Sequence, residues 1–123
     1  MPQYKINKGC ILLDKPLILE SGELLENVTI TYETYGELHA DRSNAVLVAH
    51  ALTGSASANE WWGTLIGEGK ALDPNEYFII CANCIGSCYG STGPSADVSF
   101  PQITIRDIAS GTFALLDAIG IDS

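Results

Sequence analysis

The sequence predicts an α/β protein with a mostly parallel sheet and flanking helices. Two short apolar runs, at 45–49 and 77–84, lack the polar alternation of a half-exposed strand, which is typical of strands buried in a parallel sheet. Apolar residues then recur at helical spacing over 105–119, so strand and helix alternate in the second half of the chain. No repeat, linker or low-complexity tract interrupts the chain, and we expect residues 1–123 to form a single domain.

The front of the chain predicts two strands that are antiparallel or meandering. Residues 17–20 form a short apolar run that Ser21 and Gly22 close. Residues 28–35 alternate with period two and are rich in β-branched and aromatic types, which predicts a strand with one wet face. A polar connection over 36–44 leads to the first buried strand.

The second half of the chain predicts two helices around the second buried strand. Small residues at 51–57 precede a short helix over 58–65, and strand 77–84 ends in a Gly- and Ser-rich loop at 86–94. The final helix carries its apolar face at Ile105, Ile108, Ala109, Thr112, Leu116 and Ile119, and Gly120 is placed to end it.

Composition and charge exclude several classes of protein. With 46% hydrophobic residues the chain is globular material, and 15 acidic against 6 basic residues give a net charge of -9. That charge argues against nucleic acids and anionic membranes as partners. No apolar run reaches the length of a membrane span and the N-terminus does not resemble a signal peptide, so we expect a cytoplasmic protein.

Four cysteines invite a metal interpretation, which the residues around them do not favour. Cys81, Cys84 and Cys88 have a suggestive spacing, with Cys10 as a possible fourth ligand, but the second CxxC pair of a typical zinc site is missing. Cys81 lies in an apolar run where cysteine behaves as a small hydrophobe, and residues 81 and 84 of one strand face opposite sides. We expect thiols and no metal.

The segment His50–Gly54 is the first candidate site. It follows the buried strand 45–49, and ligand sites of open parallel sheets lie just past the carboxyl ends of such strands. Three interpretations fit: a catalytic histidine, a turn anchored by His50, and an oxyanion hole made of main-chain N–H groups. The other histidine, His39, lies in a polar connection and is expected at the solvated surface.

The loop at 86–94 is the second candidate. It lacks the Gly-Lys-Ser/Thr ending of a phosphate-binding P-loop, so we expect it to shape the mouth of a pocket. Trp61 and Trp62 are expected to pack against the short helix, and one of them could line the site.

Six segments in this order resemble one family: Glu33–Gly36, His50–Gly54, Trp61-Trp62, Tyr77–Asn83, Gly86–Pro94 and Thr104–Asp107. From about Leu17 to the last residue, the chain resembles the N-terminal portion of the homoserine O-acetyltransferases. The resemblance implies an incomplete α/β-hydrolase domain: strands one to four and the helix before strand five. It also implies a ping-pong reaction of methionine biosynthesis, in which an acetyl group passes from acetyl-CoA to a serine and then to the hydroxyl of L-homoserine.

The resemblance also assigns roles to residues of this chain. In the α/β-hydrolase fold the loop after the third strand supplies one oxyanion-hole N–H, and by this carry-over the donor is the N–H of Leu52, with His50 supporting the turn. Thr53, Gly54 and Tyr89 are the candidate substrate-binding residues. No cofactor is expected to stay bound, since acetyl-CoA is a co-substrate.

The nucleophile of such an enzyme is missing from these residues. The G-x-S-x-G elbow does not occur in these residues, and the serines directly after a glycine, at 55, 87 and 91, fall one place early. The resemblance places the Ser-Asp-His triad and the arginine for the homoserine carboxylate beyond residue 123. We therefore expect this chain to be inactive by itself.

Several alternatives stay open at this stage. The chain could instead be a segment of an esterase of the same fold, or a non-catalytic truncated interaction module. Acetyl and succinyl donors, and homoserine and serine acceptors, are not distinguished. The resemblance implies a homodimer for the full-length protein, and the open edge of strand 45–49 predicts that residues 1–123 alone are marginally stable and self-associate, or belong to a longer chain.

Overall fold

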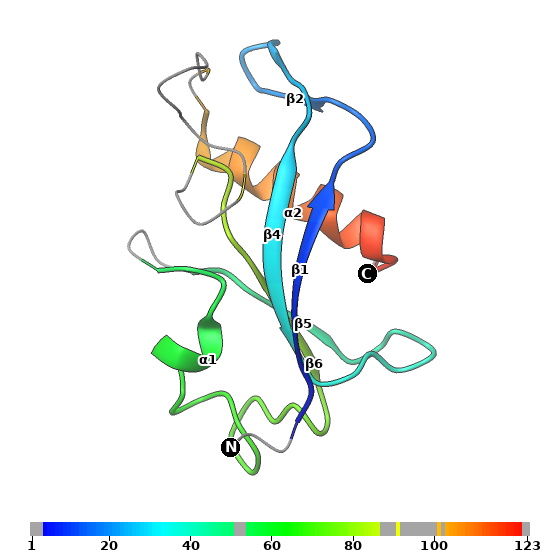
Figure 1. Ribbon diagram of the computed structural model, residues 1–123, viewed down its shortest axis with the longest axis vertical. Coiled ribbons are helices and arrows are strands. Elements are labelled where there is room, and N and C mark those ends of the chain that lie inside the picture. The colour runs from blue at the N-terminus through cyan, green and yellow to red at the C-terminus, as the bar shows by residue number, and fades with distance from the viewer. Residues whose placement is uncertain (1–3, 51–53, 87–90, 92–100, 102, 122–123) are drawn as a thin grey trace. The chain divides into compact units, whose positions relative to one another are not determined.

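The computed structural model describes residues 4–50, 54–86, 91, 101 and 103–121. Its elements follow one another as β1 (Ile6–Leu12), β2 (Leu17–Ile18), β3 (Leu24–Leu25), β4 (Thr29–Tyr35), β5 (Ala45–Val48), α1 (Ala58–Trp61), β6 (Phe78–Ala82) and α2 (Ile105–Ile119) (Figure 1). They form two compact units. Unit one holds residues 1–9, 32–82 and 123, and unit two holds residues 10–31 and 83–122.

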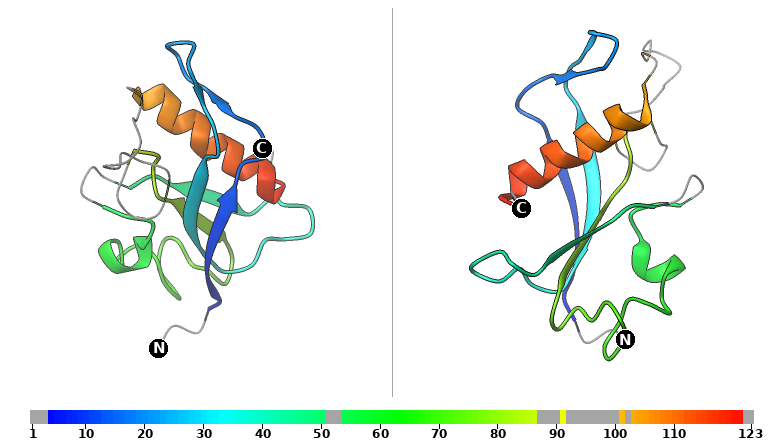
Figure 2. Two further views of the ribbon diagram at one scale, coloured as in Figure 1. Left: turned by 45° about the horizontal axis from the view of Figure 1, so that its top comes forward. Right: turned by 180° about the vertical axis from the view of Figure 1, so that it is seen from behind.

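The main sheet has the strand order β1-β4-β6-β5 (Figures 1 and 2). β4 runs antiparallel to β6, with Tyr35 opposite Ile79, whereas β5 runs parallel to β6, with Val48 opposite Cys81. The predicted α/β class is confirmed, and the sheet in the described part of the chain is mixed. Antiparallel or meandering strands were predicted at the front of the chain, but the pairing of β4 with β6, a later strand, was not predicted, because the order of strands along the chain does not give the pairing partner.

β6 is the buried centre of unit one. Ile79, Ile80 and Cys81 are fully buried, which confirms the second buried strand and shortens it at both ends. β5 differs from the prediction, because Leu47 has an exposed fraction of 41% and only Val48 is fully buried in this strand. In the described residues β5 is the last strand of the sheet, so it is paired with a strand on one side only.

β4 has no wet face in its second half, contrary to the prediction. Glu33, Thr34 and Tyr35 are all buried, although successive side chains of a strand point to opposite faces. Both faces of β4 are covered there. The alternation of residue types therefore overstated the exposure of this strand.

One face of the sheet in unit one carries the apolar core. Glu33 of β4, Cys81 of β6 and Val48 of β5 stand in one cross-strand row. The core cluster consists of Tyr35, Val48, Ala58, Ile66, Ile79 and Cys81, against which Tyr4, Ile6, Val46 and Leu72 pack. The segment that follows β5 therefore covers this face through Ala58.

Two local elements differ from the sequence prediction. α1 is a single turn, Ala58–Trp61, where a helix to residue 65 was expected. β1 was not predicted, because its sequence INKGCIL shows neither a continuous apolar run nor clean alternation. β1 is hydrogen-bonded to its neighbour β4 in the sheet, and the residue types within β1 do not predict such pairing.

Unit two combines the hairpin β2–β3 with helix α2. Leu17 pairs with Leu25, and the buried side chains of this unit include Leu19, Val28, Ile85 and Leu115. α2 confirms the predicted helix, and Gly120 ends it in the left-handed conformation, with φ 88°.

The buried line of α2 differs from the predicted apolar face. The buried residues are Asp107, Gly111 and Leu115, spaced four apart, while Ile105 has an exposed fraction of 82%. Gly111 allows close approach, since a Cβ there would lie 3.5 Å from the side chain of Ile85. The helical pattern of residue types predicted the helix correctly. Of the predicted face, Ile108, Thr112, Leu116 and Ile119 are half-buried beside this line, and Ile105 and Ala109 are exposed.

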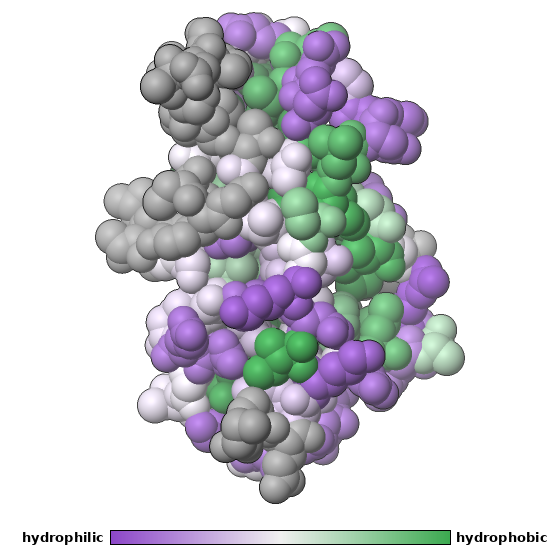
Figure 3. Space-filling view, viewed as in Figure 1, coloured by the Kyte–Doolittle hydropathy of each residue, from purple (hydrophilic) through white to green (hydrophobic). Residues whose placement is uncertain are grey.

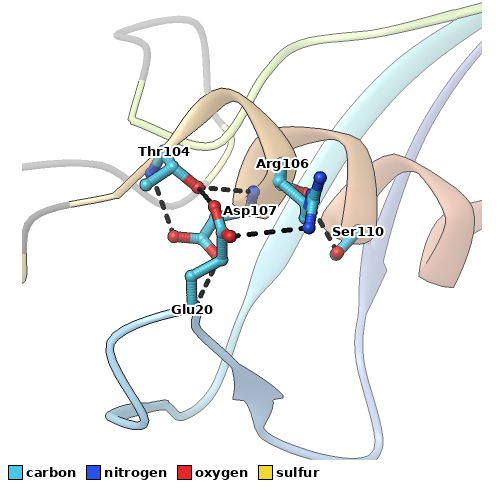
Figure 4. A network of polar contacts seen from close by, with 5 residues as sticks. All are labelled: Glu20, Thr104, Arg106, Asp107 and Ser110. Carbon is cyan, nitrogen blue, oxygen red and sulfur yellow. Dashed lines mark hydrogen bonds and ion pairs between the residues drawn. The ribbon is translucent and has the colours of Figure 1, made fainter.

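The N-terminus of α2 is capped by a polar network (Figure 4). The Thr104 hydroxyl accepts from the N–H of Asp107, and the Asp107 carboxylate accepts from the N–H of Thr104 at 2.9 Å, which is a capping box. The N–H of Glu20 also donates to Asp107, at 2.9 Å. Asp107 therefore joins the loop after β2 to the start of α2.

Apolar side chains also reach the surface among hydrophilic ones (Figure 3). The exposed large hydrophobic residues are Leu12, Ile18, Leu24, Leu47, Trp61, Trp62, Leu65, Tyr77, Ile105 and Phe113. His39 is exposed, as predicted. Within the described ranges, no helix has the length and apolar character needed to cross a membrane.

Candidate functional site

The predicted oxyanion segment is described by the structure only at its two ends. Leu52 and Thr53 lie outside the described residues, as does Tyr89. His50 lies two residues after the end of β5 and is half-buried, and Gly54, also half-buried, resumes the described chain. The structure therefore gives the surroundings of the predicted site, and not the position of its donor.

A buried pair on β4 lies under the segment that follows Gly54. Glu33 and Tyr35 are two residues apart on one strand, so their side chains share a face of the sheet. The Tyr35 hydroxyl donates to Oε1 of Glu33 at 2.8 Å and lies 3.2 Å from the carbonyl oxygen of Ala56. Tyr35 is fully buried and Glu33 has an exposed fraction of 8%.

The same segment is held by further hydrogen bonds. The Ser57 hydroxyl donates to Oε2 of Glu33 at 2.5 Å. The indole N–H of Trp61 donates to the Ser55 carbonyl at 2.9 Å, and the thiol of Cys81 lies 3.8 Å from that oxygen. We call Glu33, Tyr35, Ser55, Ala56 and Ser57 the loop anchor, because they tie this segment to the sheet.

The electrostatics of the loop anchor keep Tyr35 as a donor. Burial raises the pKa of the Tyr35 hydroxyl far above its ordinary value, and the hydrogen bond to Glu33 raises it further. The phenol therefore stays protonated at any physiological pH. Its single proton is donated to Glu33 at 2.8 Å, and the carbonyl oxygen of Ala56 at 3.2 Å is the more distant alternative acceptor.

The segment Glu33–Gly36 was among those that carry the family resemblance, with no role expected of its individual residues. A charged residue and a tyrosine at positions i and i+2 of a predicted strand were the available signal, since such residues share a face. The partner Ser57 lies on a different element, and only the tertiary structure brings it within reach of Glu33.

A second polar cluster in unit two holds Ser91 of the Gly-rich loop. The Ser91 hydroxyl donates to the Asn83 carbonyl at 2.6 Å and accepts from the N–H of Thr31 at 3.0 Å. Asn83 in turn donates to the Thr31 hydroxyl at 2.7 Å. Because Ser91 is buried and its proton is engaged, it is a structural serine rather than a nucleophile.

The described cysteines differ in their solvent exposure. Cys10 is exposed, Cys81 is buried and Cys84 is half-buried, and burial raises the pKa of the Cys84 thiol. In the part of the chain that the structure describes, no three His, Cys, Asp or Glu side chains gather as metal ligands would.

Unit two also contains an open groove of about 530 Å³. It is lined by residues 11–17 together with Ala114, Asp117 and Ala118 of α2. Its charged lining residues are one lysine and two aspartates, and they do not converge on a defined ligand chemistry.

Solved structures that superpose on this chain show its fold class. The chain superposes on the acetyl esterase MekB with a TM-score of 0.82 at 35% identity, covering 95% of this chain and 35% of that one. It superposes on homoserine O-acetyltransferase from Staphylococcus aureus with a TM-score of 0.77 at 31% identity, covering 98% and 37%. The chain therefore has an α/β-hydrolase fold, as the sequence predicted.

The sequence relatives identify the family. The chain is 48% identical to homoserine O-acetyltransferase from Geotalea uraniireducens over 136 aligned positions, covering 95% of this chain and 37% of the relative. It is also 48% identical to homoserine O-acetyltransferase from Nostoc punctiforme, covering 90% and 34%. No protein-family model matches the sequence. The chain belongs to the homoserine O-acetyltransferase family and spans about a third of the length of these relatives.

Proposed function

We propose that the chain is the N-terminal portion of a homoserine O-acetyltransferase. The observation that carries the proposal is the 48% identity to such enzymes over 95% of the chain. In the proposed reaction, an acetyl group leaves the thioester of acetyl-CoA for a serine of the full-length protein. It then passes to the side-chain hydroxyl of L-homoserine, a step of methionine biosynthesis, and we propose that this occurs in the cytoplasm.

The main chain after β5 is the proposed oxyanion site. Acyl transfer builds negative charge on the carbonyl oxygen of the acetyl group, and preorganised N–H donors stabilise that charge. We propose the N–H of Leu52 as one donor, with His50 supporting the turn. The parallel pairing of β5 with β6 supports this proposal, because it brings the segment to a carboxyl-terminal strand end.

Thr53, Gly54 and Tyr89 are proposed to contact the substrates. Acetyl-CoA acts as a co-substrate, and the proposal includes no permanently bound cofactor. We also propose that the full-length protein is a homodimer.

The experiment compares the full-length protein that begins with this chain and residues 1–123 alone. Released CoA is measured with a thiol reagent after addition of acetyl-CoA and homoserine. The full-length protein should release CoA and form O-acetylhomoserine, whereas residues 1–123, which lack a G-x-S-x-G elbow, should stay at background. Turnover by residues 1–123 would refute the proposal that this chain needs a nucleophile from elsewhere.

Replacing each substrate in turn tests the identity of the acyl donor and of the acyl acceptor. Succinyl-CoA in place of acetyl-CoA, and serine in place of homoserine, should each react at least about tenfold more slowly by kcat/KM if the named substrates are the native ones. Equal or faster reaction with either would replace that substrate in the proposal.

An esterase is the second candidate, favoured by the likeness to acetyl esterase MekB at 35% identity. Both candidates form an acetyl-serine, and they differ in whether water or homoserine takes the acetyl group. Hydrolysis of an acetyl ester that homoserine does not accelerate would favour the esterase. Acceleration of product release by homoserine would favour the transferase.

A further inference from the structure

We infer that residues 57–66 are a strap that can close into one continuous helix, and that Glu33 holds this strap in a broken form. In the structure the strap consists of the single helical turn α1 followed by turns, although the sequence predicts a helix over 58–65 (Figure 1). The contacts of Ser57 account for this difference. The inference concerns the fold of unit one and does not depend on the proposed function.

A capping signal at the start of α1 goes unused in the structure. Ser57 and Glu60 are three residues apart, in the S-x-x-E spacing of a capping box. In the described part of the chain, the Ser57 hydroxyl caps no helix N–H, and the Ser57 N–H donates to the Ser55 hydroxyl at 3.3 Å. The N–H of Glu60 donates instead to the Ser57 carbonyl, at 3.0 Å. The capping box is therefore present in the sequence and unformed in the fold.

The Ser57 hydroxyl is drawn away from α1 by a buried carboxyl group. It donates to Oε2 of Glu33 at 2.5 Å, while Tyr35 donates to Oε1. Glu33 has an exposed fraction of 8%, and a buried carboxyl group is costly unless its oxygens are hydrogen-bonded. If Ser57 turned to cap α1, Oε2 would lose this donor. Glu33 therefore favours the broken form of the strap.

The broken form is close to a continuous helix. The N–H of Trp62 donates to the Ala58 carbonyl at 2.8 Å, and the N–H of Ile66 donates to the Trp62 carbonyl at 2.9 Å. Both bonds join residues four apart, as in an α-helix. The break lies at Trp62, whose ψ of 32° is not helical. Within the described residues, the backbone hydrogen bonds of the strap leave out the N–H groups of Gly63 and Thr64, and bonding these to the carbonyls four residues earlier would join the two turns.

Closure of the strap would also bury Trp62. Ala58, Trp62 and Ile66 are spaced four apart, so a continuous helix places them along one face. Ala58 and Ile66 already belong to the buried core cluster, whereas Trp62 has an exposed fraction of 39%. Burial of the indole favours the continuous helix, and the loss of a hydrogen bond at Glu33 opposes it. Glu33 therefore decides which form is populated.

Amide hydrogen exchange in the full-length protein tests the inference. Glu33→Leu removes the acceptor and frees Ser57 to cap α1, so exchange at Gly63 and Thr64 should slow at least about tenfold. Adding Ser57→Ala to Glu33→Leu removes the cap as well, and should return both rates to within about threefold of the unsubstituted protein. Unchanged or faster exchange at these amides in Glu33→Leu would overturn the inference, since a merely loosened core exchanges faster.

Ser57→Asp tests the same balance without changing the core at position 33. Aspartate is a good N-cap and cannot donate to Glu33, so exchange at Gly63 and Thr64 should again slow at least about tenfold. Thr34→Val is the matched control, because Thr34 lies on the same strand as Glu33 with its side chain on the opposite face, and both rates should stay within about twofold. Unchanged or faster exchange in Ser57→Asp, or equal slowing in Thr34→Val or at amides of α2, would contradict a latch at Glu33.

Tryptophan fluorescence gives an independent readout of closure. Acrylamide quenching is measured for each variant and for the same variant carrying Trp62→Phe, so that the difference reports on Trp62. The quenching constant of Trp62 should fall by about twofold in Glu33→Leu and in Ser57→Asp, since its exposed fraction of 39% would approach that of its buried neighbours. The double variant with Ser57→Ala should keep the original value. An unchanged or larger quenching constant in both single variants would show that the strap does not close.

Discussion

The Tyr35 hydroxyl donates a 2.8 Å hydrogen bond to Oε1 of Glu33, two residues earlier on the same strand. Both side chains are buried, and the pair faces the segment that follows β5. Through this pair, β4 contacts Ala56 and Ser57 of the segment that follows β5. Substitutions at this pair, at the cap of α2, at Gly36 and at β5 each have an expected outcome.

Tyr35→Phe should lower the free energy of unfolding by about 1–3 kcal/mol, because it removes the hydroxyl that donates to Oε1 of Glu33. The buried Glu33 carboxyl group then keeps only the hydrogen bond from Ser57 among these two contacts. Urea unfolding measures the change. Tyr32→Phe on the same strand is the control, since Tyr32 is half-buried and should change stability by less than about 0.5 kcal/mol. Equal losses in both variants would show that the Glu33 contact is not the cause.

Thr104→Ala should destabilise the protein by about 1 kcal/mol, because it removes the N-cap acceptor of the Asp107 N–H. Thermal unfolding followed by circular dichroism at 222 nm measures the loss. Ser110→Ala in the same helix is the control, and it should be neutral or slightly stabilising because alanine has the higher helix propensity. A neutral Thr104→Ala would contradict the role of the capping box.

The stability of the protein should fall in acid partly through Asp107. Burial opposes the ionisation of this carboxyl group, but hydrogen bonds from the N–H groups of Thr104 and Glu20 outweigh burial and hold its pKa below the ordinary value. Because the folded pKa is the lower one, the contribution is fully present above about pH 4 and is lost as the pH falls through the folded pKa.

Asp107→Asn should therefore be less stable than the unsubstituted protein at pH 7, and the difference should shrink below about pH 4. Urea unfolding at a series of pH values measures it. Asp117→Asn, at the other end of α2, removes a negative charge from the helix C-terminus and should be neutral or stabilising. A difference between Asp107→Asn and the unsubstituted protein that stays constant with pH would contradict the assignment.

Gly36→Ala should destabilise the protein by more than about 1 kcal/mol. Gly36 has φ 90°, and a Cβ there would lie 2.4 Å from the carbonyl oxygens of Pro74 and Tyr77. Gly22 has the same φ of 90° with nothing within 4 Å of the added Cβ, so Gly22→Ala carries the backbone strain alone. The difference between the two variants in urea unfolding isolates the steric contact, and equal losses would show that the contact is relieved.

Residues 1–123 alone should self-associate through the open side of β5. In the described residues this strand has a neighbour on one side only, and Leu47 is exposed on it. Sedimentation velocity should show concentration-dependent species larger than the 13.1 kDa chain, and Leu47→Lys should reduce them. A stable monomer of the unsubstituted chain at all concentrations would contradict the prediction.

The sequence alone determined the elements whose signals are local. The apolar run of β6 and the helical spacing of α2 with its glycine end both appear in the structure, because helix capping and continuous apolar character are properties of adjacent residues. The order of six motifs along the chain also indicated the family, which the sequence relatives confirm.

Only the tertiary structure decided which faces are buried and which strands pair. The burial of Glu33, the inward direction of Asp107 and the antiparallel pairing of β4 with β6 depend on elements distant in the chain. The exposure of Leu47 likewise depends on what covers a face of the sheet. Burial and strand pairing depend on contacts between distant segments. The residue types of one segment predict whether it can form a strand or a helix, but not which segment it pairs with or which face is covered.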